Sequence, residues 1–252
     1  LAKPGFKGLW GKIVSFTSGI PNIFRILGSV AVLLVLLVLA PLAIRNEFWT
    51  TLGSHVVLIS FLLVLCLVSL SLIWTPGQRI DVRILLFLNL RGKRSAFWDG
   101  IMLTITQIGS GIFAFLFAAI LGIAGDQKHM YTFLLGSVSL LLLVEFLKFL
   151  FQRSRPYVVL NSVRVVGSQD SGRSFPSGHT SQAFFMATFM TVNFDLHIAA
   201  AIAFFATAFL VAITRMYVGM HYPRDVLGGA LLGVSWGLIG VLVTQFIFQV
   251  GF

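Results

Sequence analysis

The chain has 252 residues, of which 58% are apolar and 10% charged, and its mean hydropathy is +0.97. A soluble globular domain has about a quarter charged residues, so this composition excludes an ordinary soluble domain and predicts a polytopic membrane protein. The 18 Lys and Arg against 8 Asp and Glu give a net charge of +10, which suits nucleic acid, anionic lipid or a phosphate-bearing substrate. The single cysteine, Cys66, excludes a disulfide framework and a cysteine-based metal site.

The first 25 residues combine apolar and basic side chains in a pattern that favours the membrane interface. Phe6, Trp10 and Ile13 fall on one face of a helix, with lysines nearby. Helices of this kind lie in the plane of the interface. Several glycines weaken the helix, and disorder is the alternative. We therefore expect an N-terminal amphipathic interfacial segment over residues 1–25.

The remainder, residues 26–252, reads as one membrane-embedded domain. A membrane span needs about 20 mostly apolar residues. Seven stretches reach or approach this length: Ile26–Ile44, Ser54–Trp74, Trp98–Ile123, Met130–Leu150, Thr180–Phe194, His197–Tyr217 and Asp225–Phe248. The fifth is short by this standard. In the last, Gly229, Gly233 and Gly237 recur every four residues, a pattern that lets helices pack closely. The sequence thus predicts an all-α, polytopic transmembrane bundle.

The basic residues gather on one side of the predicted bundle. Residues 76–97 are rich in arginine around an apolar run and are expected to form a second surface-lying segment. Crossing the spans in order places every Lys and Arg on one face, except Arg45 and Lys128. The positive-inside rule would make that face cytoplasmic. Because these charges are scattered over span ends and loops, they favour a membrane of anionic lipids and exclude nucleic acid as a partner.

The first motif lies at the end of the fourth span, where Lys148 is followed seven residues later by Arg155 and then Pro156. Seven residues are close to two helical turns, so both cations would share one face of a continuing helix. Snorkelling basic residues at a helix end are the alternative. Glu145 lies one turn before Lys148 and is expected inside the bundle, where a structural hydrogen bond is favoured over a tuning pair with Lys148.

The second motif is Pro176-Ser177-Gly178-His179, at the start of the fifth span. Ser177 offers a hydroxyl and a helix cap, and Gly178 lets the backbone approach a ligand. Free N–H groups at a helix start favour a bound anion, and His179 is placed to give a proton to a leaving oxygen. An N-cap beside an incidental interfacial histidine is the alternative. In the loop before it, Arg164, Asp170 and Arg173 either select a head group or are solvated.

The third motif spans the turn between the sixth and seventh spans and contains Thr214, Arg215, His221 and Asp225. The spacing of four allows the Asp225 carboxylate to hold one imidazole nitrogen of His221 and to leave the other free to attack. The Arg215 guanidinium suits phosphate oxygens. A charge-rich loop explains any one of these residues alone but not the whole set.

Together these motifs resemble the three signatures of the type 2 phosphatidic acid phosphatase superfamily, which includes membrane lipid phosphatases and soluble vanadium haloperoxidases. The resemblance covers about residues 80–240 and rests on Lys148-x6-Arg155-Pro156, Pro176-Ser177-Gly178-His179 and Arg215-x5-His221-x3-Asp225. The third motif usually opens with serine, whereas this chain has Thr214. The resemblance implies a six-span core, which the motif-bearing residues 54–250 would form, plus an extra N-terminal span.

The resemblance also implies roles for these residues. His221 would form a phosphohistidine, Asp225 would orient it, and His179 would protonate the leaving alcohol and then activate water. The residues that would hold the phosphate are Lys148, Arg155, Ser177, Gly178 and Arg215. No metal or other cofactor is expected.

We therefore expect a membrane lipid phosphatase that acts without metal on a phosphomonoester, or on the terminal phosphate of a lipid diphosphate. Phosphatidic acid, phosphatidylglycerol phosphate and polyprenyl diphosphate are the candidate substrates. The alternatives are a phosphotransferase that uses the same histidine and an anion or phosphate transporter. A haloperoxidase is disfavoured because those relatives are soluble. We expect a multi-pass protein of the plasma (inner) membrane, with the side of the active site left open.

Overall fold

The computed structural model describes residues 55–90 and 95–249, together with scattered positions between residues 24 and 42. By its internal contacts the chain divides into two units, Leu1–Thr51 and Leu52–Phe252, and all elements below belong to the second. The predicted interfacial segment, residues 1–25, and the first predicted span lie outside the described residues, apart from those scattered positions. The proposed division at residue 25 stays a prediction.

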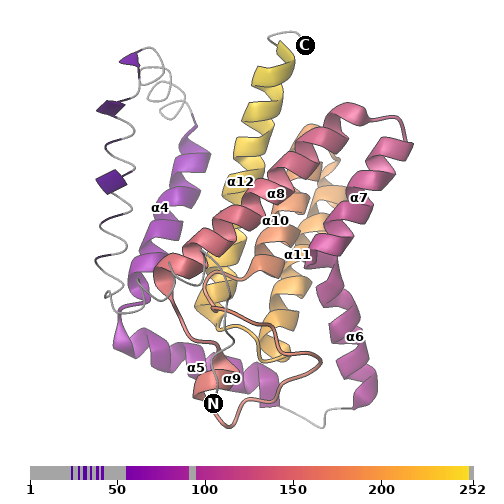
Figure 1. The fold of residues 1–252 in the computed structure, drawn as a ribbon. Helices are drawn as coiled ribbons and strands as arrows, with labels where there is room; N and C mark the ends of the chain where they lie inside the picture. The colour runs from indigo at the N-terminus through magenta and orange to yellow at the C-terminus, as the bar shows by residue number, and fades with distance from the viewer. Residues whose placement is uncertain are drawn as a thin grey trace, which may run out of the picture. The chain divides into compact units, whose positions relative to one another are not determined.

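The described part of the second unit is helical (Figure 1). The predicted spans two to seven correspond to helices, and a short 3-10 turn, Gln107–Gly109, divides the third of the seven predicted spans. These helices are α4 (Val56–Ser71), α6 (Ala96–Thr106) with α7 (Gly111–Ile123), α8 (Gln127–Phe151), α10 (Gly178–Asn193), α11 (Ile198–Tyr217) and α12 (Pro223–Gln249). Two further helices, α5 (Thr75–Leu90) and α9 (Pro156–Val159), lie in the polar segments between spans.

The centre of this unit is the pair α10 and α12, which α4, α8 and α11 surround. The glycines of α12 make the close approach possible. A Cβ at Gly229 would lie 2.7 Å from the Ser177 carbonyl oxygen, and one at Gly237 would lie 2.6 Å from Thr188 Cβ. The predicted packing role of this glycine series is therefore confirmed. Beside it, the buried rings of Phe133, Phe185 and Phe189 pack with centroids 5.2 to 5.9 Å apart.

Three helical stretches of the described chain are long and apolar enough to cross a membrane: Gln127–Val159, Ile198–Tyr217 and Pro223–Leu242. Two bent pairs raise the number to five if each forms one span: Val56–Ser71 with Thr75–Asn89 at 98°, and Ala96–Gly109 with Gly111–Ile123 at 57°. The all-α transmembrane bundle is thus confirmed. Because α10 has only 16 residues, the six-span core with an added N-terminal span stays a prediction.

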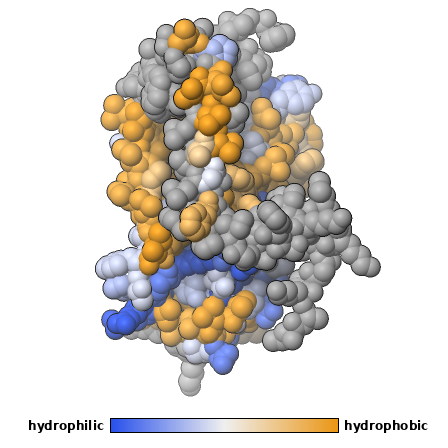
Figure 2. Space-filling model, turned by 60° about the vertical axis from the view of Figure 1, so that its left-hand side comes forward, coloured by the Kyte–Doolittle hydropathy of each residue, from blue (hydrophilic) through white to orange (hydrophobic). Residues whose placement is uncertain are grey.

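Helix α5 turns by 98° from α4 and has the two-sided character expected of a surface-lying segment. Asp81, Leu85 and Asn89 form its buried face, whereas Ile80 and Phe87 are exposed. Residues 91–94, which complete the predicted basic segment, lie outside the described residues. Figure 2 shows a large apolar surface above a hydrophilic band that crosses the lower part of the molecule.

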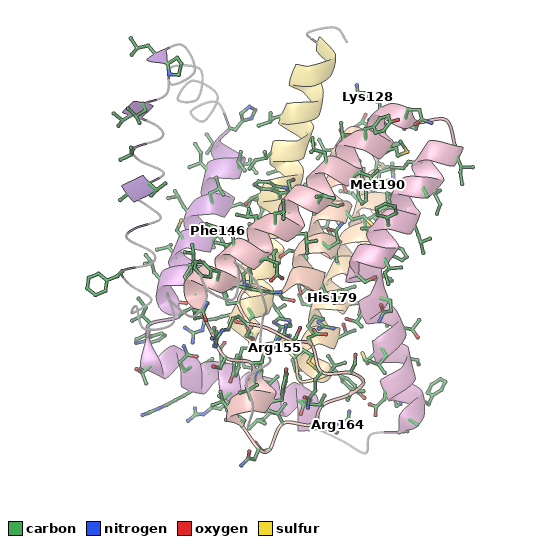
Figure 3. The ribbon with its side chains drawn as sticks, viewed as in Figure 1. Lys128, Phe146, Arg155, Arg164, His179 and Met190 are labelled. Atoms are coloured by element: carbon green, nitrogen blue, oxygen red, sulfur yellow. The ribbon has the colours of Figure 1, made fainter. Side chains whose placement is uncertain are left out.

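The motif-bearing loops lie at one end of this bundle. In Figure 3, Arg155 and Arg164 are at the lower end, and Lys128 is at the opposite end, where α7 connects to α8. This arrangement agrees with the predicted sidedness of the charges. Placing this end in the cytoplasm stays a prediction.

Candidate active site

One cavity of about 540 Å³ lies where α7, α8 and α10 meet. At one end it is lined by five of the eight predicted site residues: Lys148, Arg155, Gly178, His179 and His221. Toward the other end, apolar side chains of α7 and α8 line it, among them Phe115, Leu134 and Leu141. The structure therefore brings segments far apart in the sequence to one polar pocket that continues into an apolar groove, with Arg155 and His179 both in the lower half of Figure 3.

The first motif reaches the cavity in a way that the sequence spacing did not predict. Helix α8 ends at Phe151, and Gln152 takes a left-handed conformation with φ of 51°. Arg155 then has the extended backbone, with ψ of 153°, that a following proline imposes. The helix therefore does not continue to Arg155, and the condition under which Lys148 and Arg155 would share one of its faces is not met. They lie on separate elements that both line the cavity.

Two predicted phosphate-binding arginines converge on a carboxylate. Asp170 Oδ2 accepts a hydrogen bond from Arg215 Nη2 and lies 3.5 Å from Arg155 Nη1. Both guanidinium groups are almost fully buried, and the Nε atom of each has no hydrogen-bond partner among the described residues. Burial by itself would raise the pKa of the Asp170 carboxyl, but Arg215 and Arg155 outweigh burial and hold that pKa below its usual range. The Asp170 carboxylate therefore occupies the space between the Arg155 and Arg215 guanidinium groups.

His221 lies in the turn between α11 and α12, and its hydrogen bonds fix its tautomer. Its Nδ1 atom is 2.8 Å from the Ser174 carbonyl oxygen, which can only accept a hydrogen bond, so Nδ1 carries the hydrogen. Its Nε2 atom therefore keeps a lone pair, and Arg155 Nη1 lies 3.3 Å from it. Burial lowers the pKa of His221 to about 4, and the neighbouring Arg155 adds to this effect. The hydrogen bond at Nδ1 and the lowered pKa both favour the neutral imidazole, whose lone pair is on Nε2.

Asp225 is fully buried in the first turn of α12, but it does not hold His221 directly. The shortest distance between its carboxylate and His221 Nδ1 is 3.8 Å. The carboxylate instead accepts hydrogen bonds from Arg153 Nη1 at 2.6 Å, from Ser174 Oγ at 2.5 Å and from the Tyr222 N–H at 2.8 Å. Because Ser174 also binds His221 through its carbonyl, Asp225 reaches the imidazole mainly through Ser174.

The second motif begins α10 as the sequence predicted. Ser177 is the N-cap, and its Oγ atom lies 3.5 Å from the Thr180 N–H and 2.9 Å from Thr180 Oγ1. Gly178 and His179 follow at the first positions of the helix, where backbone N–H groups have no acceptor within the helix. Both residues line the cavity. This end of α10 therefore presents N–H groups of the kind that bind anions.

Comparison with known proteins identifies the family. The model of the PAP2 superfamily matches residues 129–249, which include all three motifs. The lipid A 4'-phosphatase of Bacteroides thetaiotaomicron is 33% identical over 61% of this chain and 72% of its own length. The chain belongs to the PAP2 superfamily. Within it, the chain is in the membrane lipid phosphatase branch and is an integral, multi-pass membrane protein.

Two further PAP2 relatives extend this finding. An undecaprenyl-diphosphatase of Sulfolobus acidocaldarius is 27% identical over 63% of this chain and 76% of its own length. The crystal structure of a transmembrane PAP2-type phosphatidylglycerolphosphate phosphatase from Bacillus subtilis superposes with a TM-score of 0.66 at 25% identity, covering 76% of this chain and 98% of that one. The fold of the second unit is therefore that of a transmembrane PAP2 protein.

Two features of the PAP2 motifs take a different form here from the one expected. Thr214 keeps the hydroxyl of the usual serine, but this hydroxyl donates to the Val211 carbonyl oxygen at 2.6 Å inside α11. Lys148 donates to Glu145 Oε1 at 2.7 Å. Glu145 was expected inside the bundle, but its side chain is 57% exposed, and Glu145 lines the same cavity as Lys148. Lys148 therefore lines the cavity without joining the arginine cluster.

The sequence did not predict that Ser174, Arg153 and Asp81 belong to this PAP2 site. Ser174 contacts both His221 and Asp225, and Arg153 connects Asp225 to Asp81 on α5, where Nη2 is 2.5 Å from Asp81 Oδ2. In the sequence, this second cluster of carboxylates and arginines is indicated only by the position of Arg153, two residues before Arg155. Within the described residues, no three His, Cys, Asp or Glu side chains gather closely enough to hold a metal ion.

Proposed function

We propose that this PAP2 protein hydrolyses the terminal phosphate of a membrane lipid through a phosphohistidine at His221. The observation that carries the proposal is the single cavity, polar at the motif end and apolar along α7 and α8. Such a cavity suits a ligand with a phosphate head and a hydrocarbon chain. Phosphatidic acid, phosphatidylglycerol phosphate and polyprenyl diphosphate all meet this description. With a diphosphate, the reaction would be acid anhydride hydrolysis.

The proposed chemistry uses two histidines. His221 Nε2 attacks phosphorus, and the bond from phosphorus to the leaving oxygen breaks. His179, which lines the same cavity, donates a proton to that oxygen. Water, deprotonated by His179, then attacks the phosphohistidine and releases inorganic phosphate and His221. Asp225 keeps His221 oriented through Ser174, which binds both residues.

The phosphate would be held by cations and by the start of α10. Arg155 and Arg215 already bind a carboxylate together, and a phosphate oxygen would replace it. Gly178 supplies a backbone N–H, Ser177 caps the helix that presents it, and Lys148 supplies a third cation on the wall of the cavity. Preorganised donors of this kind stabilise the charge of a transferring phosphoryl group. We therefore propose a reaction that uses no metal.

The surroundings support a lipid and a bilayer as partners. The groove side of the cavity is lined by α8, which is long and apolar enough to cross a membrane, and by α7, which meets this test together with α6. A lipid chain can therefore stay in the hydrocarbon region while its phosphate reaches the arginines. The basic α5 side of the bundle suits anionic lipid heads. We propose the plasma (inner) membrane as the location.

The test is a panel of lipid phosphates incubated with the purified protein in detergent, followed by measurement of free phosphate. We expect release from at least one lipid, release that persists with a chelator, and loss of release in His221→Ala, which should remain folded. A phosphorylated acceptor in place of free phosphate would indicate the phosphotransferase. Intact tracer phosphate crossing a vesicle membrane would indicate the transporter. Turnover by His221→Ala would overturn the assignment of the nucleophile.

A further inference from the structure

The apolar groove of the cavity contains one polar pair that the proposed chemistry does not use. Gln182 on α10 and Ser137 on α8 both line the cavity, and Gln182 Nε2 donates to Ser137 Oγ at 3.0 Å. Their neighbours along the cavity wall are the apolar Leu134, Val138 and Leu141 of α8. Polar side chains in an apolar wall are costly unless they are hydrogen-bonded. The bond between these two side chains satisfies only part of their hydrogen-bonding capacity.

The pair has hydrogen-bond donors that the bond between its two members does not use. A glutamine amide has two N–H donors and a serine hydroxyl has one, and the bond between the two side chains uses only one of these. Within the described residues, Ser137 makes no bond to the carbonyl one turn earlier, whereas Ser139 on the same helix donates to the Leu135 carbonyl oxygen at 2.7 Å. The Ser137 hydroxyl is therefore free to donate to an acceptor in the cavity.

The position of the pair relative to the phosphate end is also defined. Gln182 follows His179 by three residues on α10, which places it on the same face and about 4.5 Å further along the helix axis. An acceptor bound by the pair would therefore belong to the part of the ligand that directly follows its phosphate. In an acylated lipid phosphate, that part carries the first ester or amide carbonyl. A polyprenyl chain carries no carbonyl.

We propose that Ser137 and Gln182 form a carbonyl-binding subsite, which selects lipid phosphates whose acyl chains are joined through an ester or an amide. This inference rests on the proposed lipid phosphatase function and names its substrate class. The carbonyl oxygen accepts hydrogen bonds from Ser137 Oγ–H and from the second N–H of Gln182. Polyprenyl diphosphates enter the groove without this interaction.

The experiment compares two lipids that differ only in this group: a diacylglycerol phosphate and the dialkyl ether of the same chain lengths. Both are presented to the wild-type protein in the same detergent micelles, and kcat/KM is measured from phosphate release. We expect the ester to be preferred by about fivefold, the effect of one net hydrogen bond. Equal rates for ester and ether would overturn the subsite and leave the lipid phosphatase function standing. Hydrolysis of a polyprenyl diphosphate but of neither glycerol lipid would also overturn the subsite alone, whereas phosphate release from none of these lipids would overturn both proposals.

Two variants separate recognition from structure. Gln182→Leu and Ser137→Ala should each reduce the preference for the ester toward one, with little change for the ether. Ser139→Ala is the matched control, because Ser139 lies on the same helix but is bound by Trp236 Nε1 at 3.0 Å and does not line the cavity. It should keep the wild-type preference. If the pair only joined α8 to α10, both lipids would lose rate equally and the preference would persist, which would contradict the proposal. Should Gln182→Leu fail to fold, Ser137→Ala and the wild-type ratio decide the question.

Discussion

Asp225 and Asp170 are both bound by arginine side chains, but their surroundings differ. Asp225 is fully buried and accepts hydrogen bonds from Arg153, Ser174 and the Tyr222 N–H. Asp170 has a side chain that is 32% exposed, lines the cavity, and meets both Arg155 and Arg215 through the same oxygen, Oδ2. The first carboxylate belongs to a closed cluster that is part of the fold. The second lines the cavity, where we propose that a phosphate replaces it.

The comparison shows why the two clusters have different consequences for function. The cluster of Asp225 extends away from the cavity, since Arg153 also binds Asp81, and Arg224 Nε lies 2.8 Å from the same Asp81 oxygen. It therefore connects α5 and α12 and holds the Ser174 carbonyl against His221. The cluster of Asp170 consists of a loop carboxylate and two buried cations whose Nε atoms have no partner in the described part of the chain. Removal of Asp225 should therefore lower stability and turnover, whereas removal of Asp170 should strengthen the binding of anions.

The largest effect is expected from Asp225→Asn. The substitution removes the charge that neutralises Arg153, and breaking a buried ion pair costs about 3–5 kcal/mol of stability. It also disturbs the group that orients His221, for which losses in kcat are on the order of 10⁴-fold. Thermal unfolding in detergent and kcat/KM for a lipid phosphate measure the two effects. Asp99→Asn is the control, because Asp99 binds Arg164 and Tyr217 away from the cavity. Near-normal turnover by Asp225→Asn would show that Asp225 does not position His221.

Arg155→Ala should cost about 10²–10³-fold in kcat, because it removes one preorganised donor from the phosphate. It tests whether the Asp170 cluster is the phosphate site. Arg164→Ala serves as its matched control, since Arg164 pairs with Asp99 at 2.7 Å and does not line the cavity. Steady-state kinetics on the same lipid compare the two variants. Equal rates for the two arginine variants would place the phosphate elsewhere.

His221 lies between the two clusters, and its titration reports on both. Its pKa is lowered from 6.5 to about 4, which corresponds to roughly two to three orders of magnitude in proton affinity. Because the neutral form is favoured, the imidazole should stay unprotonated as the pH falls from 8 to about 5. The chain has five histidines, so NMR of protein labelled at the histidine ring, assigned with His221→Ala, can follow it. A midpoint near 6.5 would contradict the burial of a neutral His221.

The smallest effect, and one of opposite sign, is expected from Asp170→Asn. Without the internal carboxylate, inorganic phosphate or vanadate should inhibit more strongly, by about tenfold for one displaced charge-assisted hydrogen bond. In the absence of anions, the unfolding temperature should fall, because Arg155 and Arg215 then repel each other without a counterion. Inhibition constants and thermal unfolding with and without phosphate measure this pair of effects. Weaker inhibition would show that Asp170 supports the phosphate site, and the two clusters would then act alike.

The sequence predicted five of the residues that line the cavity, because the three motifs stand at helix ends. Lys148 near the end of α8, His179 at the start of α10 and His221 after α11 were expected on one face, and all three line the same cavity. The glycines of α12 were correctly assigned to packing. The kink after Phe151 was not predicted, because a spacing of seven residues does not reveal a left-handed Gln152.

By itself, the sequence determined the membrane-protein class, the helical elements and the set of reactive side chains, because these depend on composition, hydrophobic length and local spacing. Only the tertiary structure decided which partners those side chains have. Ser174, Asp170 and Arg153 come from loops and helix ends whose paths follow no periodic pattern, and Gln182 meets Ser137 only where α10 crosses α8. Hydrogen bonds depend on distance and direction between atoms that are far apart in the chain, so they are set by the packing of the helices.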